Sequence, residues 1–151
     1  MPRKDYAEFA KNACKSAKKD WDKEKWAEFA NHLSYTSIDA TDPKANWDEI
    51  KKRLTRDDRI CVFYLATTPR IYVKICEALQ ANGLNGPWSR LVLEKPIGTD
   101  LESAQAINSG VGAVFPENSI YRIDHYLGKE TVQNLLAVSY THLTLPTIYS
   151  V

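Results

Sequence analysis

The 151-residue sequence contains no long apolar run and no signal sequence. No stretch approaches the roughly 20 apolar residues that are needed to span a bilayer, and the first residues lack the apolar core of a signal peptide. The net charge of +1 gives no electrostatic reason to expect a nucleic acid or an anionic membrane surface as a partner. We therefore expect a cytoplasmic protein that binds neither nucleic acid nor membrane.

Cysteine is scarce, and the three that are present have neither metal-binding nor redox spacing. Cys61 lies in an apolar, strand-like run, and Cys76 lies on the apolar stripe of a predicted helix. Buried thiols commonly act as small hydrophobic groups. We predict no metal site and assign no chemistry to Cys14, Cys61 or Cys76.

A glycine-rich phosphate loop is also missing, because none of the six glycines forms part of a G-x-G-x-x-G sequence. That fingerprint is expected after the first strand of a dinucleotide-binding fold. Two interpretations stay open at this point. Either the protein does not use a dinucleotide, or the segment that holds the loop is absent from this sequence.

The first third of the chain has a helical pattern. Apolar residues recur at helical spacing over residues 5–19 and again over residues 26–33. Asn46 followed by Glu49 resembles a capping residue with its returning acid, which predicts a helix that runs to Leu54. We find no internal repeat and no low-complexity linker.

Strand and helix patterns alternate after this region. Residues 60–65 are continuously apolar, as expected of a strand covered on both faces. A helical stripe then ends at Gly83, and residues 91–93 form a second apolar strand. Thr99 and Glu102 fit a capping box for a helix that continues to Ser109.

A third strand is predicted over residues 119–123, and a further helix is expected to begin near Lys129. Alternating strands and helices are typical of an α/β fold with a parallel sheet. Ligands of such sheets bind beyond the carboxyl ends of the strands. Thr67, Lys95 and Asp124 all fall at predicted strand ends, so this edge is the candidate site.

The residues from Asp124 to Lys129 suggest how a ligand is held. Neighbouring strand residues point to opposite faces, so Asp124 and His125 diverge, and Asp124 is available to orient a different histidine. His125 and Lys129 are four residues apart, and with the Tyr126 hydroxyl and the free amides of a helix start they suit a phosphate. The alternative is a polar strand end whose charges are merely solvated.

Four ordered motifs resemble the glucose-6-phosphate dehydrogenase family. They are found in residues 63–69 (FYLATTP), 94–101 (EKPIGTDL), 122–130 (RIDHYLGKE) and 131–135 (TVQNL). The resemblance covers about residues 5–136 and is strongest after residue 60. Ile97 replaces the usual phenylalanine and Thr68 the first of a usual proline pair, which we interpret as drift in packing.

The resemblance implies a partial Rossmann-like NAD(P)-binding domain that leads into an α+β domain. It implies that Lys95, His125, Tyr126 and Lys129 bind glucose 6-phosphate. It also implies that Tyr72 and Lys95 contact NADP, and that Asp124 orients a catalytic histidine that this sequence lacks. The family further suggests a homo-oligomer, either a dimer or a tetramer.

The resemblance also leads us to expect an internal fragment. We expect residues 1–125 to be the later part of the NADP-binding domain and residues 126–137 the start of the substrate and dimerisation domain. Residues 138–151 resemble one reading frame of a sequencing-library adapter, so His142 is not assigned as the missing base, and His32 is interpreted as structural. We expect this chain alone to be inactive.

Two other functions remain to be weighed against a dehydrogenase fragment. A stand-alone, non-catalytic phosphosugar-binding module would use the same phosphate-binding residues. A short-chain oxidoreductase of another family would need the glycine fingerprint that is missing here.

Overall fold

The computed structural model describes residues 3–17, 21–54 and 59–125. These residues form two compact units, one drawn from the described residues within 3–40 and 44–54 and the other from those within 41–43 and 59–125. Within the described residues, no helix is both long enough and apolar enough to cross a membrane.

The first unit contains the helices α1 (Arg3–Ala17), α2 (Lys23–Asn31) and α3 (Asp48–Leu54). Asp22 caps α2, because its carboxylate accepts hydrogen bonds from the backbone amides of the first turn at 2.9 and 3.1 Å. The three predicted helices are confirmed, but the cap predicted at Asn46 is wrong. Since α3 begins at Asp48, Trp47 occupies the position before the first helical residue, and its carbonyl accepts the first helical hydrogen bond.

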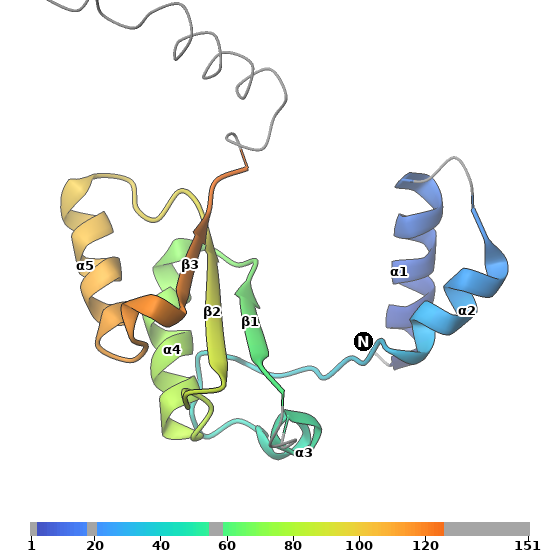
Figure 1. The fold of residues 1–151 in the computed structure, drawn as a ribbon, viewed down its shortest axis with the longest axis horizontal. Coiled ribbons are helices and arrows are strands. Elements are labelled where there is room, and N and C mark those ends of the chain that lie inside the picture. The colour runs from blue at the N-terminus through green and yellow to red at the C-terminus, as the bar shows by residue number, and fades with distance from the viewer. Residues whose placement is uncertain (1–2, 18–20, 55–58, 126–151) are drawn as a thin grey trace, which may run out of the picture. The chain divides into compact units, whose positions relative to one another are not determined.

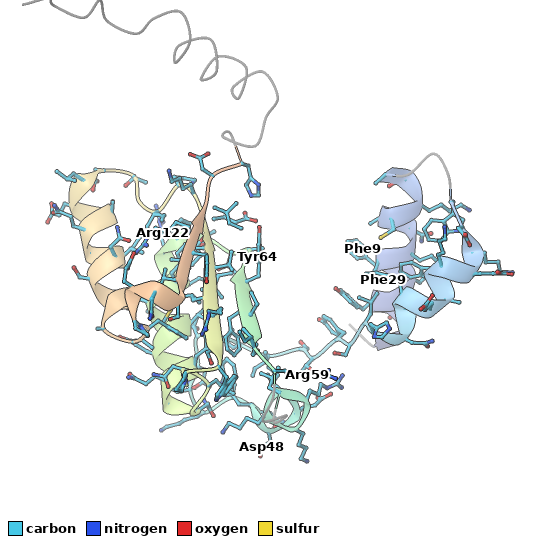
Figure 2. The ribbon with its side chains drawn as sticks, in the orientation of Figure 1. Phe9, Phe29, Asp48, Arg59, Tyr64 and Arg122 are labelled. Atoms are coloured by element: carbon cyan, nitrogen blue, oxygen red, sulfur yellow. The ribbon has the colours of Figure 1, made fainter. Side chains whose placement is uncertain are left out.

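The apolar stripes of α1 and α2 are only partly covered. Phe9 is 64% exposed and Phe29 is 50% exposed (Figure 2). No residue of α2 or α3 is buried. The well-packed core of the described residues is therefore found in the second unit.

The second unit is built on a parallel sheet. Its described strands are β1 (Cys61–Leu65), β2 (Ser89–Glu94) and β3 (Ile120–Ile123), in the order β1-β2-β3. The short helix η1 (Pro69–Ile71) and α4 (Tyr72–Ala81) connect β1 to β2, and α5 (Leu101–Gly112) and η2 (Glu117–Ser119) connect β2 to β3. Figure 1 shows α4 and α5 on one side of this sheet. The predicted α/β class and the parallel sheet are confirmed.

Residues of β2 and of the two long helices make the core. Leu91, Leu93, Ala78 and Val111 are completely buried. The helices α4 and α5 touch at Gly110, where a Cβ atom would lie only 2.7 Å from a methyl group of Val73. The alternation of strand side chains puts Leu91 and Leu93 on the same face of β2, which is the face that the helices cover.

The end of α4 follows the prediction from the sequence. Gly83 adopts a left-handed φ of 69°, which a residue with a side chain adopts only with strain. The amide of Gly83 donates to the carbonyl of Gln80, and the amide of Leu84 donates to the carbonyl of Leu79, each at 2.9 Å. These paired bonds are a Schellman motif, so Gly83 stops α4 and turns the chain towards β2.

The start of α5 differs from the prediction by one residue. Asp100 is the capping residue, and its carboxylate accepts a hydrogen bond from the Ser103 amide at 2.7 Å. The amide of Asp100 in turn donates to the hydroxyl oxygen of Ser103 at 3.1 Å, which completes the capping box. The box predicted from Thr99 and Glu102 is therefore wrong by one residue. Asp100 and Ser103 have the same three-residue spacing as Thr99 and Glu102, and Asp100 is as good a capping residue as Thr99.

One face of β1 is open, which contradicts the expectation of cover on both faces. Val62 is 56% exposed and Tyr64 is 46% exposed, and Tyr121 on β3 is 51% exposed. Tyr64 pairs in register with Val92, which in turn pairs with Tyr121, so these residues share a face. Among the described elements of the second unit, α4 and α5 both pack on the other side of the sheet (Figure 1), although Val92 on the central strand is only 8% exposed.

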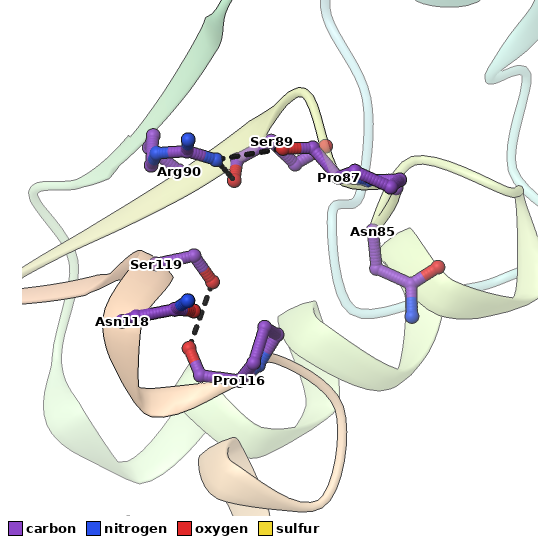
Figure 3. Close-up of a pocket in the computed structure, with 8 residues that line it drawn as sticks. Asn85, Pro87, Ser89, Arg90, Pro116, Asn118 and Ser119 are labelled. Carbon is purple, nitrogen blue, oxygen red and sulfur yellow. Dashed lines mark hydrogen bonds between the residues drawn. The ribbon is translucent and has the colours of Figure 1, made fainter.

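A hollow of about 310 Å³ lies at the amino-terminal edge of the sheet, opposite the predicted site (Figure 3). Its polar side chains bond to backbone carbonyls. Asn85 donates to Val114, Ser89 to Leu84, Arg90 to Pro87 and Ser89, and Ser119 to Pro116. These bonds hold the loops that enter β2 and β3, so we interpret the hollow as a structural junction.

The cysteines differ in exposure. Cys76 is completely buried, as predicted, while Cys61 is partly buried and Cys14 is exposed. Burial raises the pKa of the Cys76 thiol to about 12 and also raises the pKa of Cys61. Among the described residues, no group of three or more histidine, cysteine or acidic side chains is arranged to hold a metal ion.

Candidate active site

The carboxyl ends of the three described strands meet at one edge of the second unit. β1 continues into Thr67 and Thr68, β2 into Lys95, and β3 into Asp124 and His125. The backbone amide of Lys95 donates to the carbonyl of Ile123 at 3.1 Å, which extends the pairing of β2 and β3 to this edge. The predicted convergence of polar strand ends is therefore present.

Lys95 and Asp124 form an ion pair across β2 and β3. The Lys95 Nζ atom lies 3.2 Å from Oδ2 of Asp124. The Lys95 side chain is 50% exposed and the Asp124 side chain 23% exposed, so this pair stabilises the fold by no more than about 1 kcal/mol. Its main consequence is geometric, since it brings an ammonium group and a carboxylate together where a ligand of this sheet would bind.

His125 and Asp124 contact different residues, in agreement with the divergence predicted from strand alternation. Nε2 of His125 lies 3.4 Å from Oε1 of Glu94. The same Glu94 oxygen accepts a hydrogen bond from the Tyr64 hydroxyl. The chain Tyr64–Glu94–His125 thus joins the ends of β1, β2 and β3.

The pKa values of Glu94 and Tyr64 respond to this arrangement. The hydrogen bond from Tyr64 lowers the pKa of Glu94, and the bond from His125 lowers it further. The same bond raises the pKa of Tyr64, because deprotonation would place a second negative charge beside the Glu94 carboxylate. Glu94 is therefore an ionised acceptor at neutral pH.

Tyr72 is placed at the same edge, with its side chain only 1% exposed. Its hydroxyl donates towards the carbonyl oxygens of Glu94 at 3.1 Å and Leu65 at 3.4 Å. Burial raises the pKa of this hydroxyl, so it stays protonated. Tyr72 therefore ties together the ends of β1 and β2 and offers only a small surface to a ligand.

Two adjoining cavities lie beyond these strand ends. One, of about 410 Å³, is lined by Tyr72, Glu94, Lys95 and the turn at residues 66–69. The other, of about 490 Å³, shares Thr68, Pro69 and Pro96 with the first and extends to the start of α5. The peptide bond between Lys95 and Pro96 is cis. The edge therefore has both polar groups and room for part of a ligand.

Arg122 holds β3 in place behind the site. Its Nε atom donates to Oδ1 of Asn108 on α5 at 3.0 Å, and its two terminal nitrogens donate to the carboxylate of Glu117. Arginine forms this forked, two-point contact because its guanidinium is planar. Arg122 thus fixes the strand that carries Asp124 and His125.

Of the residues predicted from the sequence, Lys95, Asp124, His125 and Tyr72 come together at this edge. Tyr126 and Lys129 lie outside the described residues, as do residues 138–151 with His142. His32 is an exposed residue at the end of α2. Sequence reasoning assigned no role to Tyr64 and Glu94. The sequence feature that could have indicated their contact is a tyrosine in an apolar strand together with an acidic residue at the end of the next strand.

Comparison with known proteins identifies the family of the chain. The family model described as "Glucose-6-phosphate dehydrogenase, NAD binding domain" matches residues 1–134. The chain belongs to the glucose-6-phosphate dehydrogenase family. This is a family of oxidoreductases, and its nicotinamide-cofactor-binding domain has a Rossmann-like fold, as the sequence motifs predicted.

Curated relatives are named glucose-6-phosphate 1-dehydrogenase. The chain is 51% identical over 116 residues to glucose-6-phosphate 1-dehydrogenase of Gluconobacter oxydans, which is 76% of this chain and 24% of the relative. It is 47% identical over 127 residues to the enzyme of Mycolicibacterium smegmatis, which is 81% of this chain and 26% of the relative. The chain thus spans about a quarter of the length of these relatives.

Solved structures extend the likeness to the fold. The structure of glucose-6-phosphate 1-dehydrogenase from Mycobacterium avium matches with a TM-score of 0.79 and 31% identity, over 94% of this chain and 30% of that one. A glucose-6-phosphate dehydrogenase in complex with its substrate glucose 6-phosphate matches with a TM-score of 0.65 and 34% identity. That match covers 79% of this chain and 26% of the other.

Proposed function

We propose that this chain forms part of an enzyme that oxidises D-glucose 6-phosphate to 6-phospho-D-glucono-1,5-lactone, with NADP as the hydride acceptor. This reaction is the first step of the oxidative pentose phosphate pathway. The observation that carries the proposal is the meeting of Lys95, Asp124 and His125 beside a cavity at the carboxyl edge of the sheet. The relatives' activity and the substrate named for a solved neighbour support it.

In this proposal the sugar phosphate is held by His125, Tyr126 and Lys129. The imidazole of His125 is 60% exposed at the end of β3, so an anion can reach it. Lys129 would supply a full positive charge four residues further on, and Tyr126 a hydroxyl donor. Charge-assisted contacts of this kind contribute roughly 1.5–3 kcal/mol each.

Lys95 is proposed to contact both the sugar and the cofactor. Lys95 lines the 410 Å³ cavity together with the turn after β1, and its ammonium group lies 3.2 Å from Asp124 at the end of β3. Asp124 is proposed to orient a catalytic histidine supplied from elsewhere in the enzyme. A carboxylate in this role fixes the imidazole and stabilises its protonated form as it removes the proton of the sugar hydroxyl.

The residues at this edge fit one end of a nicotinamide cofactor. The cavity is lined by Tyr72, Lys95, Pro69 and Pro96, together with Glu94. When bound, NADP supplies the hydride acceptor. We propose that Tyr72 and Lys95 limit the space available to the cofactor and keep it against the sugar, which lowers the entropic cost of bringing the two together.

The non-catalytic phosphosugar-binding module is less well supported, because the curated relatives and both solved neighbours carry the name of the dehydrogenase. The expected homo-oligomer, the cytoplasmic location and the domain boundaries at residues 125 and 137 stay predictions. The same holds for the expectation that this chain alone shows no activity.

A hybrid enzyme tests the proposal. Residues 1–134 of this chain would replace the matching residues of the full-length Gluconobacter oxydans enzyme, to which the chain is 51% identical. We expect the hybrid to reduce NADP with glucose 6-phosphate and to discriminate against fructose 6-phosphate and glucose 1-phosphate. A hybrid that folds, as judged by circular dichroism, and yet leaves NADP unreduced would refute the proposal.

A further inference from the structure

We propose that Glu94 is a positioning residue for substrate binding, which holds His125 towards the phosphate and is itself fixed by Tyr64. The proposal rests on the phosphate-binding role of His125 given above. It assigns a role to two residues that the family resemblance did not single out. The geometric basis is the chain of contacts that crosses all three described strand ends.

The first step concerns the imidazole of His125. This side chain is 60% exposed and follows the last residue of β3, so packing alone does not fix its orientation. The Glu94 carboxylate lies 3.4 Å from Nε2 and is 33% exposed. An ionised carboxylate accepts from an imidazole N–H, so this contact selects a state in which Nε2 carries a proton. Nδ1 is then left for the ligand, and it donates to a phosphate oxygen when the ring carries a proton on both nitrogens.

The second step concerns the carboxylate itself. A glutamate side chain has several rotatable bonds, and an unrestrained one would lose conformational entropy when it orients another residue. Tyr64 limits this freedom, because its hydroxyl donates to the same oxygen, Oε1, that faces His125. The tyrosine is attached to β1, which is hydrogen-bonded to β2, so a rigid sheet supports the contact.

The third step concerns the position of the three residues in the sheet. Tyr64 pairs in register with Val92, and Glu94 is two residues beyond Val92, so Tyr64 and Glu94 lie on the same face. On this face Val62 and Tyr121 are exposed and apolar. Glu94 therefore lies where the open face meets the carboxyl edge. Lys95, the next residue, pairs with Asp124, so adjacent residues of β2 support two different parts of the site.

The test uses the hybrid enzyme and glucose 6-phosphate. Glu94→Gln keeps the shape of the side chain but removes its charge, and Tyr64→Phe removes only the hydroxyl. We expect Glu94→Gln to raise the KM for glucose 6-phosphate about five- to ten-fold and Tyr64→Phe about two- to three-fold, since the groups are partly exposed. The kcat should change less than the KM, because the effect is on binding.

A double-mutant cycle separates positioning from general damage. If Glu94 acts through His125, the variant with both Glu94→Gln and His125→Asn should have the KM of His125→Asn alone, within about two-fold. With unphosphorylated glucose as the substrate, Glu94→Gln should lower kcat/KM by a smaller factor than with glucose 6-phosphate. Glu102→Gln, a carboxylate-to-amide change at an exposed residue of α5, is the matched control. The proposal would be overturned if the KM increases of the two single variants multiplied in the double variant. It would also be overturned if Glu94→Gln lowered kcat/KM equally with glucose and with glucose 6-phosphate.

A second measurement needs no catalysis and therefore separates this inference from the proposed function. In the chain itself, with histidine labelled by ¹⁵N, the imidazole signals of His125 are assigned by their loss in His125→Asn. Both Glu94→Gln and Tyr64→Phe should move these signals, and Glu102→Gln should not. Signals of His125 that are the same in all four proteins would overturn the inference even if the hybrid is an active dehydrogenase.

Discussion

The ammonium nitrogen of Lys95 lies 3.2 Å from a carboxylate oxygen of Asp124, although 29 residues separate the two along the chain. Each residue directly follows a strand of the same parallel sheet. The contact joins Lys95, which is proposed to touch both the sugar and the cofactor, to Asp124, which is proposed to orient the catalytic histidine. Binding and proton transfer are thus expected to depend on each other at this edge.

Replacing Lys95 tests the first half of this relationship. In the hybrid enzyme, Lys95→Ala should raise the KM for glucose 6-phosphate and also lower kcat, because the ammonium is proposed to contact sugar and cofactor. The loss of one charge-assisted contact should reduce kcat/KM roughly ten- to a hundred-fold. Steady-state kinetics with each substrate varied in turn measure both constants. A normal kcat with only a raised KM would mean that Lys95 contributes to binding alone.

Replacing Gly98 tests how the turn after Lys95 is supported. A Cβ atom at Gly98 would lie 2.6 Å from the backbone nitrogen of Ala104, so Gly98→Ala forces the turn away from the first turns of α5. We expect a loss of about 1–3 kcal/mol in the free energy of unfolding. Gly112→Ala is the control, since nothing lies within 4 Å of its added methyl group.

The readout for these glycine variants is chemical denaturation followed by circular dichroism. Gly112→Ala should leave the midpoint unchanged or raise it, because alanine is the better helix former. Equal midpoints for Gly98→Ala and the unmodified chain would show that the turn at Gly98 tolerates a side chain.

Burial of Cys76 predicts its reactivity and a dependence of stability on pH. Its pKa of about 12 leaves it almost entirely as a thiol at pH 8, whereas the thiolate is the reactive form. Native-state labelling with a maleimide should modify the exposed Cys14 and spare Cys76, as checked by mass spectrometry of peptides. Labelling of Cys76 as fast as Cys14 would contradict its burial.

Deprotonation of the Cys76 thiol should lower the stability of the fold at alkaline pH. The pKa is raised in the folded state above its ordinary value of 9.0, so the unfolded state loses the proton first as the pH rises. The stabilising contribution is therefore complete below pH 9.0 and declines towards pH 12. Cys76→Ala should show a smaller decrease in thermal midpoint over this range than the unmodified chain.

Much of the fold could be predicted from local patterns. The apolar runs at residues 60–65 and 91–93 and the stripe that ends at Gly83 depend on neighbouring residues only, and they identified β1, β2 and α4. The start of α5 was displaced because Thr99 and Asp100 are both good capping residues. Only the backbone conformation, in which Asp100 bonds to Ser103, distinguishes them.

The candidate site was only partly predictable. Lys95, Asp124 and His125 were found because polar residues at the ends of parallel strands meet at one edge. The contacts of Tyr64 with Glu94 and of Glu94 with His125 depend on the register between strands, which the sequence does not specify. The open face of β1 was missed for a related reason, since an apolar strand pattern does not identify which element covers it.

The most direct test of the account is the kinetic effect of Asp124→Asn in the hybrid enzyme. The amide retains the size of the side chain and an oxygen that can face Lys95, but it loses the charge that is proposed to stabilise the protonated base. We predict that kcat falls at least about a hundred-fold while the KM for glucose 6-phosphate changes much less. Glu102→Gln, an exposed change on α5, should leave both constants unaltered. A kcat for Asp124→Asn within about two-fold of the unmodified hybrid would contradict the account.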